Sequence, residues 1–401
     1  MSAPGRWVRL VDGSVLTGPP PCYTSGMGSP LRLRILSLSM DATANVQAGH
    51  TAKNAGLFHS LNVRHNVVGS VCPKVSRTRL WRHRLRCFHP VRRRWRPRAD
   101  LHPRMFAARS RVAGVALQQW GDRFDLILQL HTLMGPGLPL TDRPYVLHTD
   151  NTLCLSERGW PWWAPWPGRL RDEWVAMEGA VYRKAAFVFP RSEWLRRSLI
   201  EDYGCDPKRV IRVGGGANFR LCDLEAKRWD TQRALFVGRD FERKGGPELL
   251  AAWPRVRRAL PGAVLQIVGI HRPPCRLPEG VEWLGDIHNR ARMRSLFAEA
   301  SVFVMPSRFE PWGHVFYEAM GSGLPCIAAD VCAMPEIVTS EVGGVVPPGD
   351  KQALTDMLIT ILGSPDRAEA LGRAGWAAVE SGHSWEDVVD RMAPYLERAV
   401  G

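Results

Sequence analysis

Short apolar runs alternate with amphipathic runs along almost the whole chain of 401 residues. Apolar runs of this kind, bounded by glycine or proline, are typical of buried strands, and amphipathic runs are typical of helices. Strands that alternate with helices form parallel sheets, so we expect an α/β fold. The strands are predicted at Leu33–Leu38, Arg64–Val68, Phe124–Gln129, Tyr145–His148, Phe187–Phe189, Val210–Val213, Ala234–Val237, Val264–Val268, Val281–Leu284, Val302–Met305, Cys326–Ala329 and Gly344–Val346. Intervening helices include those predicted at Arg290–Glu299, Lys351–Leu362 and Asp366–Val379.

The length fits two domains of ordinary size. A glycine cluster, Gly214-Gly215-Gly216, provides a flexible joint, and we place the boundary there. The predicted organisation is a tail over residues 1–30, a first domain over 31–215, a second over 216–380 and a last helix within 381–401. The tail is rich in Gly, Pro and Ser, and we expect it to be disordered or a misassigned start.

Positive charge gathers in the first domain. The whole chain has a formal net charge of +15. Residues 1–215 hold 33 Lys and Arg against 15 Asp and Glu, so all of the positive excess lies in this part. Much of the excess lies in an arginine-rich insert, Lys74 to Arg111, which also carries Trp81, Phe88 and Trp95. Such a segment fits an anionic membrane surface. A solvated arginine-rich loop is an equal alternative, and nucleic acid is not expected as a partner.

The remaining composition predicts a cytoplasmic protein. The arginine-rich insert adds the alternative of a peripheral position on the inner face of the cell membrane. The nine cysteines are scattered without Cys-x-x-Cys spacing, which indicates reduced thiols and neither a disulfide framework nor a zinc site. No run approaches the ~20 apolar residues that span a bilayer. The first thirty residues lack the pattern of a secretory signal.

Two carboxylates, Glu310 and Glu318, stand eight residues apart across a predicted strand end, a turn and a helix start. Glu310 is expected on the loop and Glu318 in the first turns of the helix. The backbone N–H groups of Gly313, His314 and Val315 are free at that helix start, where an anion is stabilised. The layout suits a ligand that carries both phosphate and hydroxyl groups.

A second motif lies upstream, where a predicted strand closes on Gly238-Arg239 and Lys244-Gly245 follows. Two cations at a strand end can face a diphosphate, with Arg239 binding in a bidentate way and Lys244 acting as a point charge. They would also stabilise the charge on a departing diphosphate. A solvated basic loop is the alternative for this segment taken alone.

Together the two motifs resemble the signature of glycosyltransferase family 4, from about Ala180 to the chain end. The likeness is thin between Val71 and Gly121. It implies a GT-B fold, with two Rossmann-like domains facing a central cleft, and a last helix that crosses back to the first domain. It also implies that Glu318 binds ribose hydroxyls and that Glu310 contacts the donor sugar.

Further positions follow from the same resemblance. Gly269 and Asp286 end adjacent strands and would enclose the nucleotide base, and Gly49 occupies the place where the family's glycines approach phosphate and acceptor. His131 and His148 each end a predicted strand, where ligands of parallel sheets bind. We expect His131 to be catalytic and His148 to bind the ligand; capping or loop-bonded histidines are the alternative.

A loop rich in Trp and Pro, residues 159–167, contains Trp162, Trp163 and Trp166. Indole rings can stack on a sugar acceptor or sit at a bilayer interface. Plain packing beneath a loop explains the composition equally well.

The predicted function is that of a retaining glycosyltransferase, which moves a hexose from a UDP- or GDP-type sugar to a hydroxyl acceptor. A glycolipid or a cell-envelope polysaccharide is the expected acceptor. No metal and no further cofactor is expected, because Arg239 and Lys244 take the metal's role. The alternatives are a sugar-nucleotide epimerase or hydrolase on the same fold, and a non-catalytic protein that binds anionic surfaces. The donor's base and sugar, the acceptor and the oligomeric state stay open.

Overall fold

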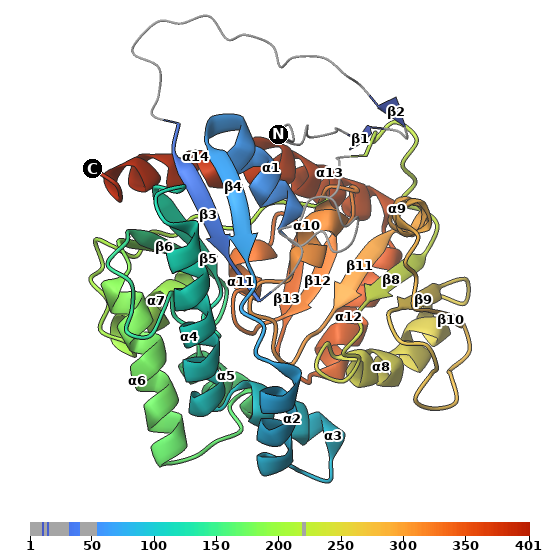
Figure 1. Ribbon diagram of the computed structural model, residues 1–401. Coiled ribbons are helices and arrows are strands. Elements are labelled where there is room, and N and C mark those ends of the chain that lie inside the picture. Colours follow the sequence, from blue (N-terminus) through green and yellow to red (C-terminus); the bar gives the residue numbers. More distant parts are fainter. Residues whose placement is uncertain (1–9, 12–13, 16–31, 41–53, 219–221) are drawn as a thin grey trace, which may run out of the picture. The chain divides into compact units, whose positions relative to one another are not determined.

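The computed structural model describes residues 10–11, 14–15, 32–40, 54–218 and 222–401 (Figure 1). The chain divides into two units, Met1–Arg32 and Leu33–Gly401. In the first unit, β1 (Leu10–Val11) pairs antiparallel with β2 (Ser14–Val15). Most of the predicted tail over residues 1–30, and the predicted site residue Gly49, lie outside the described residues.

The second unit contains two parallel sheets. The first sheet has the order β4-β3-β5-β6-β7, and every neighbouring pair runs parallel. Its strands are β3 (Arg34–Leu38), β4 (Asn66–Val71), β5 (Leu126–Leu130), β6 (Tyr145–Thr149) and β7 (Phe187–Pro190). All residues of β5, β6 and β7 are buried, as expected for strands with helices on both faces.

The second sheet has the order β10-β9-β8-β11-β12-β13, also with parallel neighbours. Its strands are β8 (Arg233–Val237), β9 (Val264–Val268), β10 (Val281–Gly285), β11 (Val302–Met305), β12 (Cys326–Ala329) and β13 (Gly343–Val346). The predicted α/β class with two parallel sheets is confirmed. The domain boundary after residue 215 stays a prediction.

Helices cover both faces of the first sheet. One face packs on α4 (Pro103–Trp120), α6 (Arg169–Lys184) and α7 (Glu193–Glu201), through buried side chains such as Phe106 and Trp174. The other face packs on α1 (Ala55–Arg64) and on α14 (Trp385–Arg398) at the chain's end. Figure 1 shows α14 running beside α1. The last helix of the chain therefore completes the core of the first sheet.

The second sheet has a separate core, in which Trp253 and Leu358 are fully buried. Its helices are α8 (Gly246–Ala259), α9 (Arg290–Glu299), α10 (His314–Met320), α11 (Met334–Ile337), α12 (Lys351–Leu362) and α13 (Pro365–Gly382). The predicted bounds of α9 and α12 agree with these to the residue.

The arginine-rich insert is helical. It forms α2 (Arg77–Arg86), α3 (Arg92–Asp100) and the start of α4, and Figure 1 shows α2 beyond the arrowhead of β4. The loop expected as one alternative is therefore wrong in its local structure. The carboxyl ends of parallel strands form the ligand-binding edge of such sheets. The insert leaves the sheet at this edge.

The strand predicted at Val210–Val213 is absent. Only Val210 makes a strand-like bridge, to Val188 of β7. Val210 and Val213 are buried against the first sheet. Backbone hydrogen bonds also join the segment to β7, because Ile211 N donates to the Val188 carbonyl oxygen and Val213 N to that of Pro190. The segment therefore lies beside β7, although only Val210 pairs as a strand residue.

Candidate active site

Three strands of the second sheet end close together at predicted site residues. Gly269, after β9, has a φ of +132°, and a Cβ atom there would lie 2.3 Å from the carbonyl oxygen of Gly238. Only glycine permits this approach of the two strand ends. Beside them Arg239 Nη2 lies 3.4 Å from Asp286 Oδ1, and 69% of the Arg239 side chain is exposed. Arg239 is thus near the predicted base-enclosing loops and open to a ligand.

Glu310 forms the centre of a buried charge cluster. It follows β11, and its Oε2 lies 3.1 Å from Lys244 Nζ and 3.3 Å from Arg243 Nη1. Burial opposes ionisation of this carboxyl, but the two cations outweigh burial and lower its pKa. Glu310 is therefore an anion at neutral pH and does not serve as a proton donor.

Arg243 was missed by the sequence reasoning. Its guanidinium also donates to the Phe309 carbonyl oxygen and to Asp240, so it holds the loop that carries Glu310. The available signal was its place directly before Lys244 in a run that the motif had already selected. Together with Asp240, which lies 3.1 Å from Arg243 Nε, the cluster has two cations and two carboxylates.

The predicted turn before Glu318 is present. Gly313 has a φ of +66° and precedes α10, which begins at His314 and contains the half-buried Val315 and Glu318. Burial raises the pKa of Glu318 to about 7, opposed by a hydrogen bond with Asn218. The predicted anion contact with the backbone of residues 313–315 stays a prediction.

Asn218 lies on the segment that joins the two sheets. Its Oδ1 accepts a hydrogen bond from Trp385 Nε1 at 3.0 Å. The amide nitrogen is then the group that faces Glu318.

The two predicted histidines differ in exposure. His131 has a φ of +59°, its side chain is 36% exposed and its Nδ1 lies 3.2 Å from Asp150 Oδ1. His148 is fully buried, with Nε2 3.1 Å from the Gly214 carbonyl oxygen, and burial lowers its pKa to about 3. His131 is open to a ligand, whereas His148 packs against the inter-sheet segment; both ligand roles stay predictions.

A second polar cluster joins the carboxyl ends of β6 and β7 to α10. Arg191, which is 3% exposed, places Nη1 3.4 Å from Asp150 Oδ2 and 2.6 Å from His314 Nε2. A guanidinium only donates, so His314 Nε2 accepts. Burial opposes ionisation of Asp150, but His131 and Arg191 outweigh it and hold its pKa well below the ordinary range. The sequence reasoning missed Arg191, although it directly follows a strand.

The Trp/Pro loop links the insert to the Glu310 loop. Arg94 and Arg98 of α3 lie over the rings of Trp162 and Trp166, at 4.8 and 4.0 Å from the ring centroids. Trp163, in the short 3₁₀ turn η3 (Pro161–Trp163), contacts Phe309 edge-on, and Arg243 lies 5.0 Å from its centroid. Two features that the sequence left unexplained therefore pack on each other and on the loop that carries Glu310.

Other features bear on the remaining predictions. Among the described residues, no three His, Cys, Asp or Glu side chains are placed to hold a metal ion. Eight cysteines are free thiols in the same part of the chain. No described helix is both long enough and apolar enough to cross a membrane.

Comparison with known proteins identifies relatives. Residues 231–364 match the family described as glycosyl transferases group 1. A GDP-mannose-dependent monoacylated alpha-(1-6)-phosphatidylinositol monomannoside mannosyltransferase from Corynebacterium glutamicum is 36% identical over 169 residues, which cover 39% of this chain and 44% of the relative. A D-inositol 3-phosphate glycosyltransferase from Segniliparus rotundus is 33% identical over 286 residues, 66% of this chain and 62% of the relative. The matches thus span less than two thirds of either relative.

The fold has close structural counterparts. Sucrose-phosphate synthase from Thermosynechococcus elongatus superposes with a TM-score of 0.66 at 18% identity, over 91% of this chain and 98% of that structure. At this identity the likeness concerns the fold alone. It confirms the predicted GT-B class.

Proposed function

We propose, from the match of residues 231–364 to the glycosyl transferases group 1 family, that the chain is a retaining glycosyltransferase that uses a nucleotide diphosphate sugar. The observation that carries the proposal is the cluster of Glu310 with Lys244 and Arg243 inside the family-matched segment. A buried carboxylate with two cations at a strand end fits a ligand with both a phosphate and a sugar end.

Each candidate residue has a role that its surroundings support. Arg239 and Lys244 neutralise the departing diphosphate. Glu318 accepts hydrogen bonds from ribose hydroxyls, and Glu310 does the same for hydroxyls of the hexose. Because Glu310 is ionised, its negative charge also stabilises the positive charge that develops at the anomeric carbon.

The reaction balances without a protein nucleophile. The acceptor oxygen forms a bond to the anomeric carbon while the bond to the diphosphate oxygen breaks. The acceptor's proton ends on the departing diphosphate. Arg239 and Lys244 supply the positive charge that a metal would otherwise bring, so we propose metal-independent transfer.

The acceptor is proposed to be a glycolipid or a cell-envelope glycan. The name of the Corynebacterium relative includes a mannosylated phosphatidylinositol and GDP-mannose, which makes GDP-mannose the first donor to test. The exposed arginines of α3 support a peripheral position on an anionic membrane surface.

The test is turnover of GDP-mannose and of a panel of UDP- and GDP-sugars with envelope lipid extracts, followed by NMR of the product's anomeric proton. Transfer with retained configuration, undiminished by EDTA, is expected. Rapid donor consumption without acceptor would favour an epimerase or hydrolase. EDTA inhibition reversed by magnesium would contradict metal independence.

A further inference from the structure

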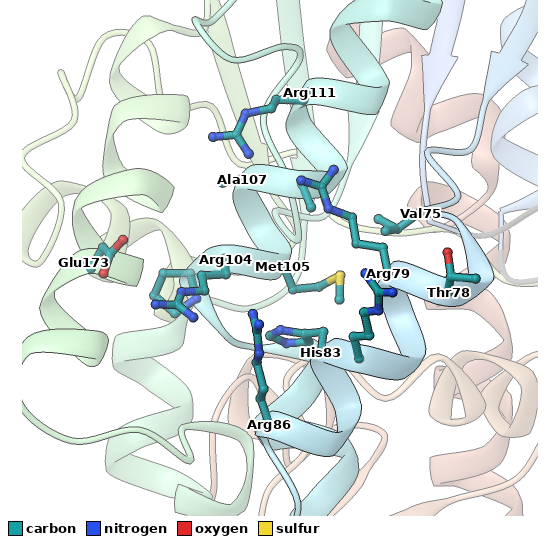
Figure 2. Close-up of a pocket in the computed structure, with 13 residues that line it drawn as sticks. Val75, Thr78, Arg79, His83, Arg86, Arg104, Met105, Ala107, Arg111 and Glu173 are labelled. Atoms are coloured by element: carbon teal, nitrogen blue, oxygen red, sulfur yellow. The ribbon is translucent and has the colours of Figure 1, made fainter.

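The first-sheet half contains a hollow that none of the roles above uses. It lies between α2, α4 and α6, with a volume of about 620 Å³. Figure 2 shows Arg79, Arg86 and Arg104 placed around it, with Glu173 on the α6 side. A second hollow of about 520 Å³ adjoins it and shares His83, Arg86, Arg104 and Glu173.

The larger hollow, called the arginine pocket below, concentrates positive charge. Five arginines line it, together with the single carboxylate of Glu173: Arg79, Arg82, Arg86, Arg104 and Arg111. Within the described ranges, none of these five guanidinium groups is paired with a carboxylate. Like charges gathered around one hollow attract an anion to it.

Arg109, in the same segment, has a structural role and so differs from the pocket arginines. Arg109 is 6% exposed, and its guanidinium is bonded to the Asp100 carboxylate at 2.9 Å and to the Asp100 carbonyl oxygen. This pair ties α4 to α3. Among the described residues the pocket arginines have no such carboxylate partner, so an ion pair of this kind does not account for them.

The backbone that carries the pocket arginines is fixed. Trp95 of α3 donates to the Arg84 carbonyl oxygen at 2.8 Å, and His83 Nε2 donates to the Ala99 carbonyl oxygen at 3.0 Å. Burial and the surrounding arginines lower the pKa of His83, and burial chiefly lowers that of His102 to about 4, so neither ring adds charge near neutral pH. The arginines are the cationic groups that meet a ligand, and Glu173 is the one carboxylate in the lining.

Volume and chemistry together define the ligand class. A cavity of this size accommodates a small molecule or one lipid headgroup. Guanidinium forks match the oxygens of phosphate in geometry and charge. We propose that the arginine pocket binds a phosphate group of the acceptor, and that the acceptor is therefore a phosphate-bearing molecule.

The pocket's position agrees with an acceptor role. It lies on the insert that leaves the first sheet at the carboxyl end of β4. The insert packs through Arg94 and Trp162 on the loop whose Trp163 reaches Phe309, next to Glu310. The identification of the ligand as the acceptor rests on the proposed function. The proposal that the pocket binds phosphate rests on its arginines alone.

The test uses the full chain and two matched variants of one helix. Arg79→Gln/Arg82→Gln removes two pocket arginines of α2. Arg77→Gln/Arg84→Gln removes two further arginines of α2 that are likewise exposed but line neither hollow. Calorimetric titration with inorganic pyrophosphate should show about tenfold weaker binding in the pocket variant and near-wild-type binding in the control.

A second double variant removes pocket arginines from another helix, so that the result does not depend on α2 alone. Arg104→Gln/Arg111→Gln on α4 should weaken binding in the same direction. Because these arginines are exposed and have no carboxylate partner among the described residues, the melting temperature of the ligand-free pocket variants should stay close to that of the wild type. A lower melting temperature in both pocket variants, with the control unchanged, would assign the arginines a structural role and overturn the proposal.

The remaining outcomes separate the alternatives. If pyrophosphate binding weakens equally in pocket and control variants, the attraction is diffuse and the proposed site is wrong. Undiminished pyrophosphate binding in all variants would also overturn the proposal. Wild type should bind two equivalents of pyrophosphate, one at the donor site. If the proposed donor site fails, wild type binds one equivalent and the pocket variants lose it.

A parallel sedimentation with phosphatidic acid and phosphatidylserine vesicles identifies the source of the phosphate. A pocket-dependent loss with phosphatidic acid alone supports a lipid headgroup. A loss with pyrophosphate alone supports a soluble phosphorylated acceptor.

Discussion

At the scale of single residues, Lys244 contacts Glu310 and also lies at the strand end where we propose that the donor's diphosphate binds. We expect Lys244→Ala and Arg239→Ala each to reduce kcat by ~10²–10³-fold, the usual cost of removing one preorganised charge from a transition state. Steady-state kinetics with the donor that supports transfer measures this.

The matched control is Arg255→Ala, an exposed arginine of α8 whose guanidinium bonds to Gln352. It removes the same charge from the same half of the chain and should leave kcat unchanged. Near-wild-type turnover in Lys244→Ala would remove this residue from the proposed mechanism.

Glu318 is expected to make nucleotide affinity depend on pH. Its carboxyl has a pKa of about 7, and the ionised form is the better acceptor for ribose hydroxyls. Nucleoside diphosphate affinity should therefore rise by ~tenfold from pH 6 to pH 8, the ratio of ionised fractions for such a group. Calorimetry on wild type and Glu318→Gln with one nucleotide cancels the nucleotide's own titration. A variant that keeps the full pH dependence would show that another group is responsible.

Individual residues were predictable where a motif fixed their neighbours along the chain. Glu310 and Lys244 were selected from loops 66 residues apart, and the structure places their charged atoms 3.1 Å apart. Arg191 was not selectable, because its partners Asp150 and His314 are brought to it by folding alone. His131 and His148 have the same local pattern, and only the tertiary cover of His148 by Gly214 and Trp385 separates them.

At the scale of elements, α3 presents Arg92, Arg94 and Arg96 as exposed side chains. We expect their replacement by Ser to reduce sedimentation with anionic vesicles at low salt, and added salt to weaken the wild type, because exposed charges are screened within ~8–10 Å. Nucleotide binding should be unaffected.

The control for α3 is a triple variant of equal charge loss in the other half, Arg255, Arg258 and Arg367 to Ser; all three are exposed. Equal loss of sedimentation in both triple variants would attribute attachment to net charge. Sedimentation of the α3 variant at the wild-type level would leave a solvated segment as the better account.

Strands and helices were predicted well where burial and hydrogen bonding agree, as in β9, β11 and β12. Val210–Val213 shows the limit, because the segment hydrogen-bonds to β7 as a strand would, but only Val210 pairs as a strand residue. The insert shows another limit. Its charge pattern left a membrane-binding segment and a solvated loop as equal alternatives, and neither predicted the contacts of Trp95 and His83 that hold α2 and α3 together.

At the scale of the whole molecule, α14 connects the end of the chain to the core of the first sheet. Met392 is fully buried there. Met392→Ala should destabilise the chain by about 2–5 kcal/mol through lost contacts and a cavity, measured by urea unfolding. Glu397→Ala, on the exposed face of the same helix, should change little. Equal stability of the two variants would mean that α14 contributes little to that core.

The two-sheet organisation followed from the alternation of strand and helix patterns, but the links between the sheets did not. Trp163 contacts Phe309, and Arg191 contacts His314, across long separations in sequence. Such contacts depend on loop conformation, which no periodic pattern encodes.

The contact between Arg243 and Trp163 also gives the protein a built-in optical reporter. Indole emission depends on nearby charge, and a donor's diphosphate arriving at Lys244 redistributes the charge beside this ring. The difference spectrum between wild type and Trp163→Phe isolates that one indole from the other fifteen of the sixteen tryptophans. Stopped-flow recording of this signal would time the arrival of donor separately from sugar transfer, without any attached dye.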